Sequence, residues 1–111
     1  LIFWEDSVAL RRRPDKGLLA GLWEFPNEAG VVLAPEHWGI KAVVQECAAQ
    51  AKHIFTHIEW HMTILCAEAK TDVLPSGWVW AGADELEKKY AIPSAFEGAL
   101  WQARVRLNGG E

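Results

Sequence analysis

The sequence predicts a single α+β or α/β domain, in which strands and helices are interspersed along the chain. Residues 52–70 alternate apolar and polar side chains with a period of two, which is typical of a strand with one buried face. Residues 35–50 and 94–107 instead repeat apolar side chains at helical spacing, as amphipathic helices do. Mixed elements of this kind pack in layers around one core. A chain of 111 residues is long enough for such a core, so we expect one domain over residues 1–111.

The N-terminal part of the chain predicts a strand, a turn and a packed loop. Residues 1–10 alternate weakly and predict a strand that stops before Pro14, because proline cannot donate to a strand ladder. A turn follows at residues 15–17, where Gly17 accommodates a positive φ. Residues 17–30 hold three glycines and a proline, so we expect an irregular loop. Its large apolar side chains should be buried, namely Leu18, Leu19, Leu22, Trp23 and Phe25.

The middle of the chain predicts a helix followed by strands. Pro35 suits the first turn of a helix that runs to Gln50. One face of that helix is apolar: Ile40, Val43, Val44, Cys47, Ala48 and Ala51. The strand of residues 52–70 follows directly, and residues 78–80 begin a last short strand.

Two capping-box spacings predict helices near the C-terminus. Asp84-x-x-Glu87 indicates a short helix through Lys89, and Ser94-x-x-Glu97 indicates a second helix. The second helix should turn one apolar face to the core: Phe96, Ala99, Leu100, Ala103 and Leu107.

Composition limits the classes of function. The formal net charge of −4 argues against a general polyanion-binding surface, but it leaves room for a local basic patch. One such run is present: Arg11, Arg12 and Arg13, with Lys16 close by. No apolar run approaches the ~20 residues that a membrane span needs.

Two further observations bear on compartment and completeness. Cys47 and Cys66 lie in apolar surroundings without a CxxC spacing, so we expect two reduced core thiols in a cytoplasmic protein. The chain starts at Leu1 and enters a strand-like segment at once, so we expect a piece of a longer protein.

Residues 53–61 hold the densest group of histidine, aromatic and carboxylate side chains. His53, His57 and His61 are four positions apart, which is ~13 Å on a strand, whereas zinc ligands lie within ~2.1 Å of the ion. Only neighbours two apart, such as Glu59 and His61, can share one ion, and His37 is the only histidine elsewhere. We therefore expect hydrogen-bonded surface histidines and no metal site.

Acid–base catalysis would require two carboxylates that converge in one pocket. Glu24 and Glu59 are the candidates beside large aromatic residues. We expect Glu24 to be a buried hydrogen-bonding group rather than a catalytic one.

Three segments resemble the C-terminal domain of MutY-type adenine DNA glycosylases. RRRPDKGLLAGLWEFPN at residues 11–27 resembles the segment that opens this domain. KHIFTHIEWHM at residues 52–62 resembles its Phe-Ser-His segment, and YAIPSAFEGAL at residues 90–100 resembles its closing Ile-Pro helix. The resemblance covers nearly the whole chain in order. It implies a Nudix-like fold, with a mixed β-sheet packed between helices.

The resemblance also implies a site. The domain in that family recognises 8-oxoguanine, which differs from guanine by a hydrogen on N7 and an oxygen at C8. By the resemblance, Phe55, Thr56 and His57 contact the lesion and its surroundings, and Thr56 replaces the family's serine. A hydroxyl that accepts the N7–H distinguishes the two bases. Strict alternation would put Thr56 on the apolar face with Ile58, so we expect residues 55–57 to form a loop or bulge.

The resemblance further implies what lies outside this chain. The family's catalytic aspartate, helix-hairpin-helix and iron–sulfur cysteines have no counterpart here, so this chain should excise nothing alone and hold no cofactor. The parent protein would carry a [4Fe–4S] cluster in its catalytic domain. It would hydrolyse the N-glycosidic bond of adenine in double-stranded DNA containing 8-oxoguanine, as a cytoplasmic monomer. Candidate contacts to the DNA backbone are Arg11, Arg12, Arg13 and Lys16.

Two alternative interpretations remain open. One is a divergent Nudix-type nucleotide pyrophosphohydrolase that uses Glu24 or Glu59. Such enzymes hold magnesium with several carboxylates on one helix, whereas the predicted helix here has only Glu36 and Glu46, ten residues apart. The other is a Nudix-like module that binds a protein partner through aromatic surface.

Overall fold

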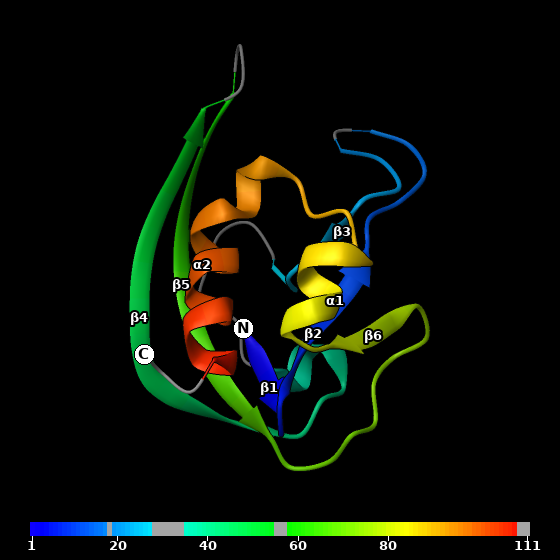
Figure 1. The fold of residues 1–111 in the computed structure, drawn as a ribbon, viewed down its shortest axis with the longest axis vertical. Coiled ribbons are helices and arrows are strands. Elements are labelled where there is room, and N and C mark those ends of the chain that lie inside the picture. Colours follow the sequence, from blue (N-terminus) through cyan, green and yellow to red (C-terminus); the bar gives the residue numbers. More distant parts are fainter. Residues whose placement is uncertain (18, 28–34, 55–57, 109–111) are drawn as a thin grey trace.

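The computed structural model describes residues 1–17, 19–27, 35–54 and 58–108, and for residues 46–48 it describes the backbone alone (Figure 1). Six strands form one mixed sheet in this part of the chain. They are β1 Ile2–Trp4, β2 Ser7–Arg12, β3 Trp23–Glu24, β4 Ala42–Ile54, β5 Glu59–Ala69 and β6 Trp78–Ala81. The strand order is β3-β2-β1-β5-β4, and β6 pairs with β2.

Strand β1 joins the two halves of the sheet. It pairs antiparallel with β2 and parallel with β5, whereas the other pairings among the described strands are antiparallel. The amino group of Leu1 donates to the carbonyl of Leu65 at 2.5 Å, and the N–H of Ala67 donates to the carbonyl of Leu1 at 2.7 Å. The long β4–β5 hairpin is therefore attached to the rest of the sheet through one short strand.

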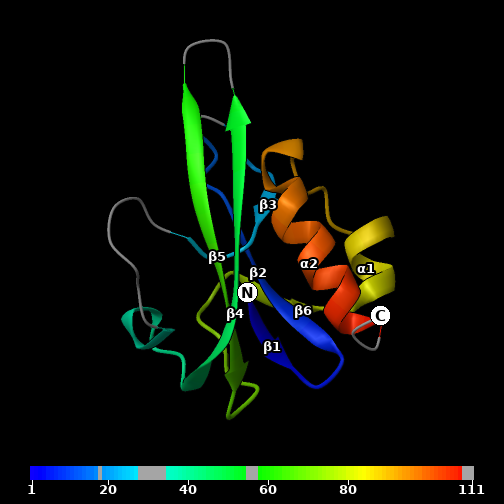
Figure 2. The same cartoon turned by 90° about the vertical axis from the view of Figure 1, so that its left-hand side faces the viewer.

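The α-helices α1 Ala83–Lys88 and α2 Glu97–Leu107 lie on the same face of the sheet (Figure 2). The larger core lies between them and the strands and includes Phe3, Val8, Leu10, Ile64, Leu86, Phe96, Ala99 and Ala103. A smaller cluster on the opposite face packs against Trp4, Trp38, Trp78 and Trp80. Trp38 ends the 3₁₀ turn η1 Pro35–Trp38. The α+β class and the mixed sheet are confirmed, but both described α-helices cover one face rather than two.

The predicted helix over residues 35–50 is wrong. Its first turn is the 3₁₀ turn η1, which Gly39 ends at a φ of +77°, and most of the remainder is strand β4. The pairing of β4 with β5 shifts register between Gln45 and Ala49. The bulge inserts two extra residues into β4 relative to β5, so the regular alternation is interrupted there and the apolar residues of the segment imitate a helical stripe. Val43 and Val44, which the helix would have buried, are about half exposed.

Several other predictions are confirmed. The predicted strand of residues 52–70 is confirmed only in part, because residues 59–69 form β5 whereas residues 52–54 belong to β4. Strand β6 starts at Trp78 as expected. Gly17 has a φ of +95° in the predicted turn. Ala99 and Ala103 are buried on the apolar face of α2, as predicted. The short 3₁₀ turn η2 Ser94–Phe96 precedes this helix.

Other boundaries differ from those predicted. Residues 1–10 form two strands rather than one, because Glu5 turns the chain at a φ of +51°. The cap of α1 is Gly82, whose N–H donates to the Glu85 carboxylate at 3.2 Å, rather than Asp84 with Glu87. None of the described helices has the length and apolar character needed to cross a membrane.

Candidate nucleic-acid interface

The β4–β5 hairpin projects beyond the rest of the domain at one end of the molecule (Figures 1 and 2). Its ladder is described up to the pair Ile54 and Glu59. The predicted lesion-reading residues Phe55, Thr56 and His57 follow Ile54 in the sequence and lie outside the described residues. The structure therefore places the strands that carry this segment, and the roles of its three side chains stay predictions.

The described surface next to this segment is partly apolar and partly ionic. Ile54 is 62% exposed and Ile58 is 50% exposed. Nearby, the Nε2 atom of His61 lies 2.8 Å from the Glu59 carboxylate, and the Lys52 ammonium lies 3.8 Å from the same oxygen. Among the described residues, no group of three His, Cys, Asp or Glu side chains is arranged to hold a metal ion.

Glu24 forms the centre of a buried ionic cluster. It is 3% exposed, and its two carboxylate oxygens accept from Arg11 Nε at 2.6 Å and Arg13 Nη1 at 2.5 Å. The side-chain amide of Asn27 donates to the same carboxylate at 3.1 Å. The predicted hydrogen-bonding role of Glu24 is thus confirmed. A buried carboxylate with two guanidinium partners is a structural group, because each charge is compensated by its neighbours.

The arginine run therefore divides into two kinds of side chain. Arg11 and Arg13 turn inward toward Glu24, and Arg11 also lies 5.9 Å from the ring centroids of both Trp38 and Trp78. Arg12 is exposed, with weak contacts to Asp15 at 3.5 Å and to the Gly21 carbonyl at 3.2 Å.

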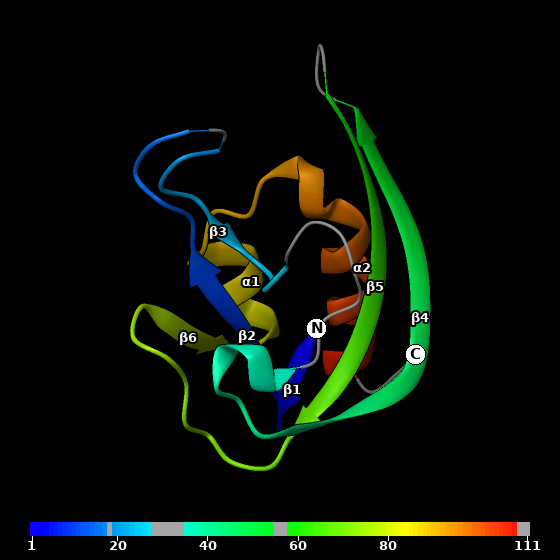
Figure 3. The same ribbon diagram turned by 180° about the vertical axis from the view of Figure 1, so that it is seen from behind.

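Lys16 is exposed on the loop that follows β2. This loop lies at the same end of the molecule as the projecting hairpin (Figures 1 and 3). Contact of Arg11, Arg12, Arg13 or Lys16 with the DNA backbone stays a prediction. Arg12 and Lys16 are the two of these side chains that the fold leaves most accessible.

Trp60 is a residue that the sequence did not single out. It is partly buried on β5, and its ring lies 5.6 Å from the Arg13 guanidinium and 5.7 Å from the Phe96 ring, measured between centroids for the ring pair. The only available sequence signal was the position of Trp60 on the apolar side of the alternating segment. Which elements meet there depends on tertiary structure, so the sequence alone does not show these contacts.

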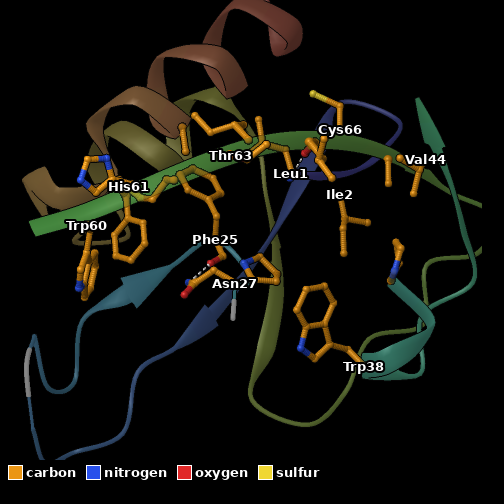
Figure 4. Close-up of a pocket in the computed structure, with 18 of the residues that line it drawn as sticks. Leu1, Ile2, Phe25, Asn27, Trp38, Val44, Trp60, His61, Thr63 and Cys66 are labelled. Atoms are coloured by element: carbon orange, nitrogen blue, oxygen red, sulfur yellow. Dashed lines mark hydrogen bonds between the residues drawn. The ribbon is translucent and has the colours of Figure 1, made fainter. Parts of the chain in front are cut away.

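A cavity of about 580 Å³ lies between β5 and the segment that follows β3 (Figure 4). Its lining is mostly apolar and aromatic, with Phe25, Trp38 and Trp60 among the larger side chains, and it includes Arg13 and Asn27. Trp38 Nε1 is a buried donor that has no hydrogen-bond partner within the described part of the chain. Leu1 also lines the cavity, and burial lowers the pKa of its amino group from 8.0 to about 6.

The expectation of reduced core thiols is wrong for Cys66. This residue is buried on β5 as predicted, but its sulfur is disulfide-bonded. The argument from compartment could not detect this, because proximity of two sulfur atoms is set by the tertiary structure and not by sequence spacing.

Comparison with known proteins identifies the family. The sequence model of the NUDIX domain family matches residues 1–102. The adenine DNA glycosylase of Mus musculus is 35% identical over 96 residues, which cover 70% of this chain and 18% of the mouse enzyme. The C-terminal domain of mouse MUTYH, solved in complex with human PCNA, matches with a TM-score of 0.54 and 24% identity, over 92% of this chain and 77% of that one. The chain therefore belongs to the NUDIX domain family, and it shares the fold of the mouse MUTYH C-terminal domain.

Proposed function

We propose that this chain is the 8-oxoguanine-recognition domain of an adenine DNA glycosylase that removes adenine mispaired with 8-oxoguanine. The observation that carries the proposal is the projecting β4–β5 hairpin, whose strands flank the Phe55-Thr56-His57 segment. The similarity to the mouse adenine DNA glycosylase supports the same assignment. A protruding hairpin is suited to this task, because it can reach a base that the body of a domain cannot approach.

Thr56 is the proposed discriminating residue. Its hydroxyl accepts a hydrogen bond from the N7–H of 8-oxoguanine, a hydrogen that guanine lacks. Facing guanine, the same hydroxyl meets the N7 lone pair, so one hydrogen bond is made in one case and rearranged or lost in the other. Phe55 supplies apolar contact to the lesion or its neighbouring base, and His57 supplies a polar contact to the lesion strand.

The distribution of exposed charge supports DNA at the hairpin end. Arg12, Lys16 and Lys52 are exposed at or near this end. Carboxylates lie beside two of them, since Arg12 is 3.5 Å from Asp15 and Lys52 is 3.8 Å from Glu59. These exposed basic side chains are the candidate contacts for DNA phosphates despite the net charge of −4.

The remaining activity belongs to parts of the parent outside this chain, which spans 18% of the length of the mouse enzyme. We place the catalytic residues and the [4Fe–4S] cluster there, and we assign the parent to the cytoplasm as a monomer, although the disulfide at Cys66 removes the thiol argument for that compartment. Residues 1–111 then act as one recognition domain.

The nucleotide pyrophosphohydrolase alternative is less well supported. Glu36 lies in the 3₁₀ turn η1 and Glu46 lies in strand β4, so one helix cannot present them together to a magnesium ion. Glu24 is engaged with two arginines. Magnesium-dependent release of phosphate from nucleotides would favour the alternative over our proposal.

A protein partner is a second role that the comparisons favour. The mouse MUTYH C-terminal domain was solved with human PCNA bound to it. We propose that the present domain also has surface for a protein partner, in addition to the DNA end.

The proposal is tested by substituting Thr56 in the full-length parent protein. We expect Thr56→Ala to lower the ratio of adenine excision opposite 8-oxoguanine to excision opposite guanine by about tenfold, the factor that one hydrogen bond of ordinary strength contributes. Thr56→Ser is the matched control, because it keeps the hydroxyl, and it should retain the ratio. Equal loss on both substrates would contradict the assigned role, as would no loss on either.

A further inference from the structure

Trp60 stands where the hairpin leaves the packed body of the domain. It pairs across the ladder with His53, and both residues are partly buried. The next described positions toward the hairpin end are mostly solvent-exposed, with Ile54 at 62% and Ile58 at 50%. Within the described part of the hairpin, Trp60 and His53 are thus the last residues anchored by packing.

Two other elements meet the Trp60 ring. The Phe96 ring of η2 lies 5.7 Å away at an interplanar angle of 56°. The Arg13 guanidinium at the end of β2 lies 5.6 Å from the same ring. Both contacts have favourable geometry, because tilted aromatic pairs and cation–π pairs are attractive at these separations.

The cation in this contact is itself held in place. Arg13 Nη1 donates to Glu24 Oε1 at 2.5 Å, and Glu24 is 3% exposed. Glu24 also binds Arg11 at 2.6 Å. The guanidinium is therefore attached to the body of the sheet, and it presents a fixed surface to Trp60.

We propose that the Arg13–Trp60–Phe96 contact is a positioning device that fixes the direction of the β4–β5 hairpin and thereby sets selectivity for the damaged base. The functional part of this inference rests on the proposed lesion recognition by residues 55–57. The physical need is clear, since a two-stranded ribbon is marginally stable unless another element packs against it. A recognition segment must also be held within about 0.5 Å of its productive geometry.

The positioning itself is tested by a distance measurement. Ile54 and Trp101 are each 62% exposed, and they lie on the hairpin and on α2. In the full-length protein, spin labels at Ile54→Cys and Trp101→Cys should give a narrow distance distribution by pulsed electron resonance. Trp60→Ala should broaden or shift it, and so should Arg13→Ala. Trp60→Phe keeps a ring against Phe96 and should largely restore the original distribution.

The consequence for selectivity is measured in the same protein without labels. We expect Trp60→Ala to lower the 8-oxoguanine to guanine excision ratio by about tenfold, with partial recovery in Trp60→Phe. Leu86→Ala is the matched control, because Leu86 is a buried core residue on α1. It should lower the thermal midpoint at least as much as Trp60→Ala and leave the ratio unchanged.

The outcomes separate the inference from the proposed function. An unchanged distance distribution in Trp60→Ala overturns the inference, whatever the enzyme does. A broadened distribution with full selectivity also overturns it. If the unmodified protein shows no preference for 8-oxoguanine, the proposed function fails, and so does the selectivity part of the inference. A broadened distribution with selective loss, absent from Leu86→Ala, supports both.

Discussion

Glu24 shows how one residue ties a sequence motif to the fold. Three groups donate to its carboxylate, from Arg11, Arg13 and Asn27, at 2.5 to 3.1 Å. The charges of Glu24, Arg11 and Arg13 are therefore compensated mainly by one another. The sequence indicated a buried hydrogen-bonding acid but not its partners, because Arg11 faces Glu24 through the pairing of β2 with β3, which is set by the tertiary structure.

Substitution of Glu24 should be costly. Glu24→Leu leaves two largely buried guanidinium groups without a counter-ion, and we expect the free energy of unfolding to fall by about 3 kcal/mol. Urea denaturation of the purified chain measures this free energy of unfolding. Glu36→Gln, at an exposed carboxylate of η1, should change it by less than about 0.5 kcal/mol. A loss at Glu24 no larger than that of the control would show that the cluster contributes little.

In a preparation that begins at Leu1, the buried amino group makes the stability depend on pH. Burial lowers its pKa to about 6 from the reference value of 8.0, so protonation favours the unfolded chain. For a preparation with a free amino group at Leu1, stability should be complete above pH 8 and decline as the pH falls from 8 toward 6, by about 2–3 kcal/mol in all. An Nα-acetylated preparation has no titratable amino group, so its stability should not decline between pH 8 and pH 6 through this group. Identical pH profiles would contradict it.

At the scale of elements, the packing of helix α2 on the hairpin depends on small residues. A Cβ atom built at Gly98 would lie 2.8 Å from the Cβ of Ala51 on β4, which is closer than real contacts allow. Gly98 is thus required by close approach rather than by backbone conformation, in contrast to Gly17 with its positive φ. The sequence placed apolar residues on this helix correctly, but it could not show which strand they would meet.

A double substitution tests this close approach. Gly98→Ala should destabilise the domain by about 1–3 kcal/mol through overpacking, although alanine is the better helix former. In the Ala51→Gly background the same change should cost less, because the space is restored. Chemical denaturation of the unmodified protein, the two single variants and the double variant gives the coupling free energy between positions 98 and 51. Additive effects would show that the contact relaxes without strain.

Strand β4 is the element whose type the sequence periodicity predicted wrongly. Its apolar residues imitate a helix because the bulge between Gln45 and Ala49 interrupts the strand period. Strand β5 has no such interruption in its described ladder from Glu59 to Ile64, so its alternation was read correctly. Periodicity reveals an element only where the backbone itself is regular. Residues 55–57, which the family resemblance singled out, lie outside the described residues, and their roles rest on the resemblance.

At the scale of the whole molecule, exposed basic residues lie near the hairpin end. They are Arg12, Lys16 and Lys52, and the carboxylates of Asp15 and Glu59 lie beside two of them. Composition gave only the net charge of −4, which suggested weak DNA binding by this chain alone. The fold leaves Arg12 and Lys16 exposed, which the net charge alone does not reveal, and these are the residues that we propose for DNA contact.

This arrangement predicts a local salt effect. In the full-length protein, Lys16→Gln should reduce the slope of log affinity for lesion DNA against log salt concentration by about 1, because one phosphate contact is lost. Lys70 is equally exposed but lies at the opposite end, after β5, so Lys70→Gln should leave the slope unchanged. Fluorescence anisotropy titrations at several salt concentrations give both slopes. Equal slopes for the two variants would place the DNA elsewhere.

The way in which β1 joins the sheet also bears on the order in which the protein folds. The β4–β5 ladder links residues close in sequence, from Ile54 with Glu59 to Ala42 with Ala69, whereas β1 reaches Ala67 from Ile2. Closing a short loop costs less chain entropy than closing a long one. The recognition hairpin is therefore expected to assemble early in the folding transition, and the parallel strand that secures it should dock late.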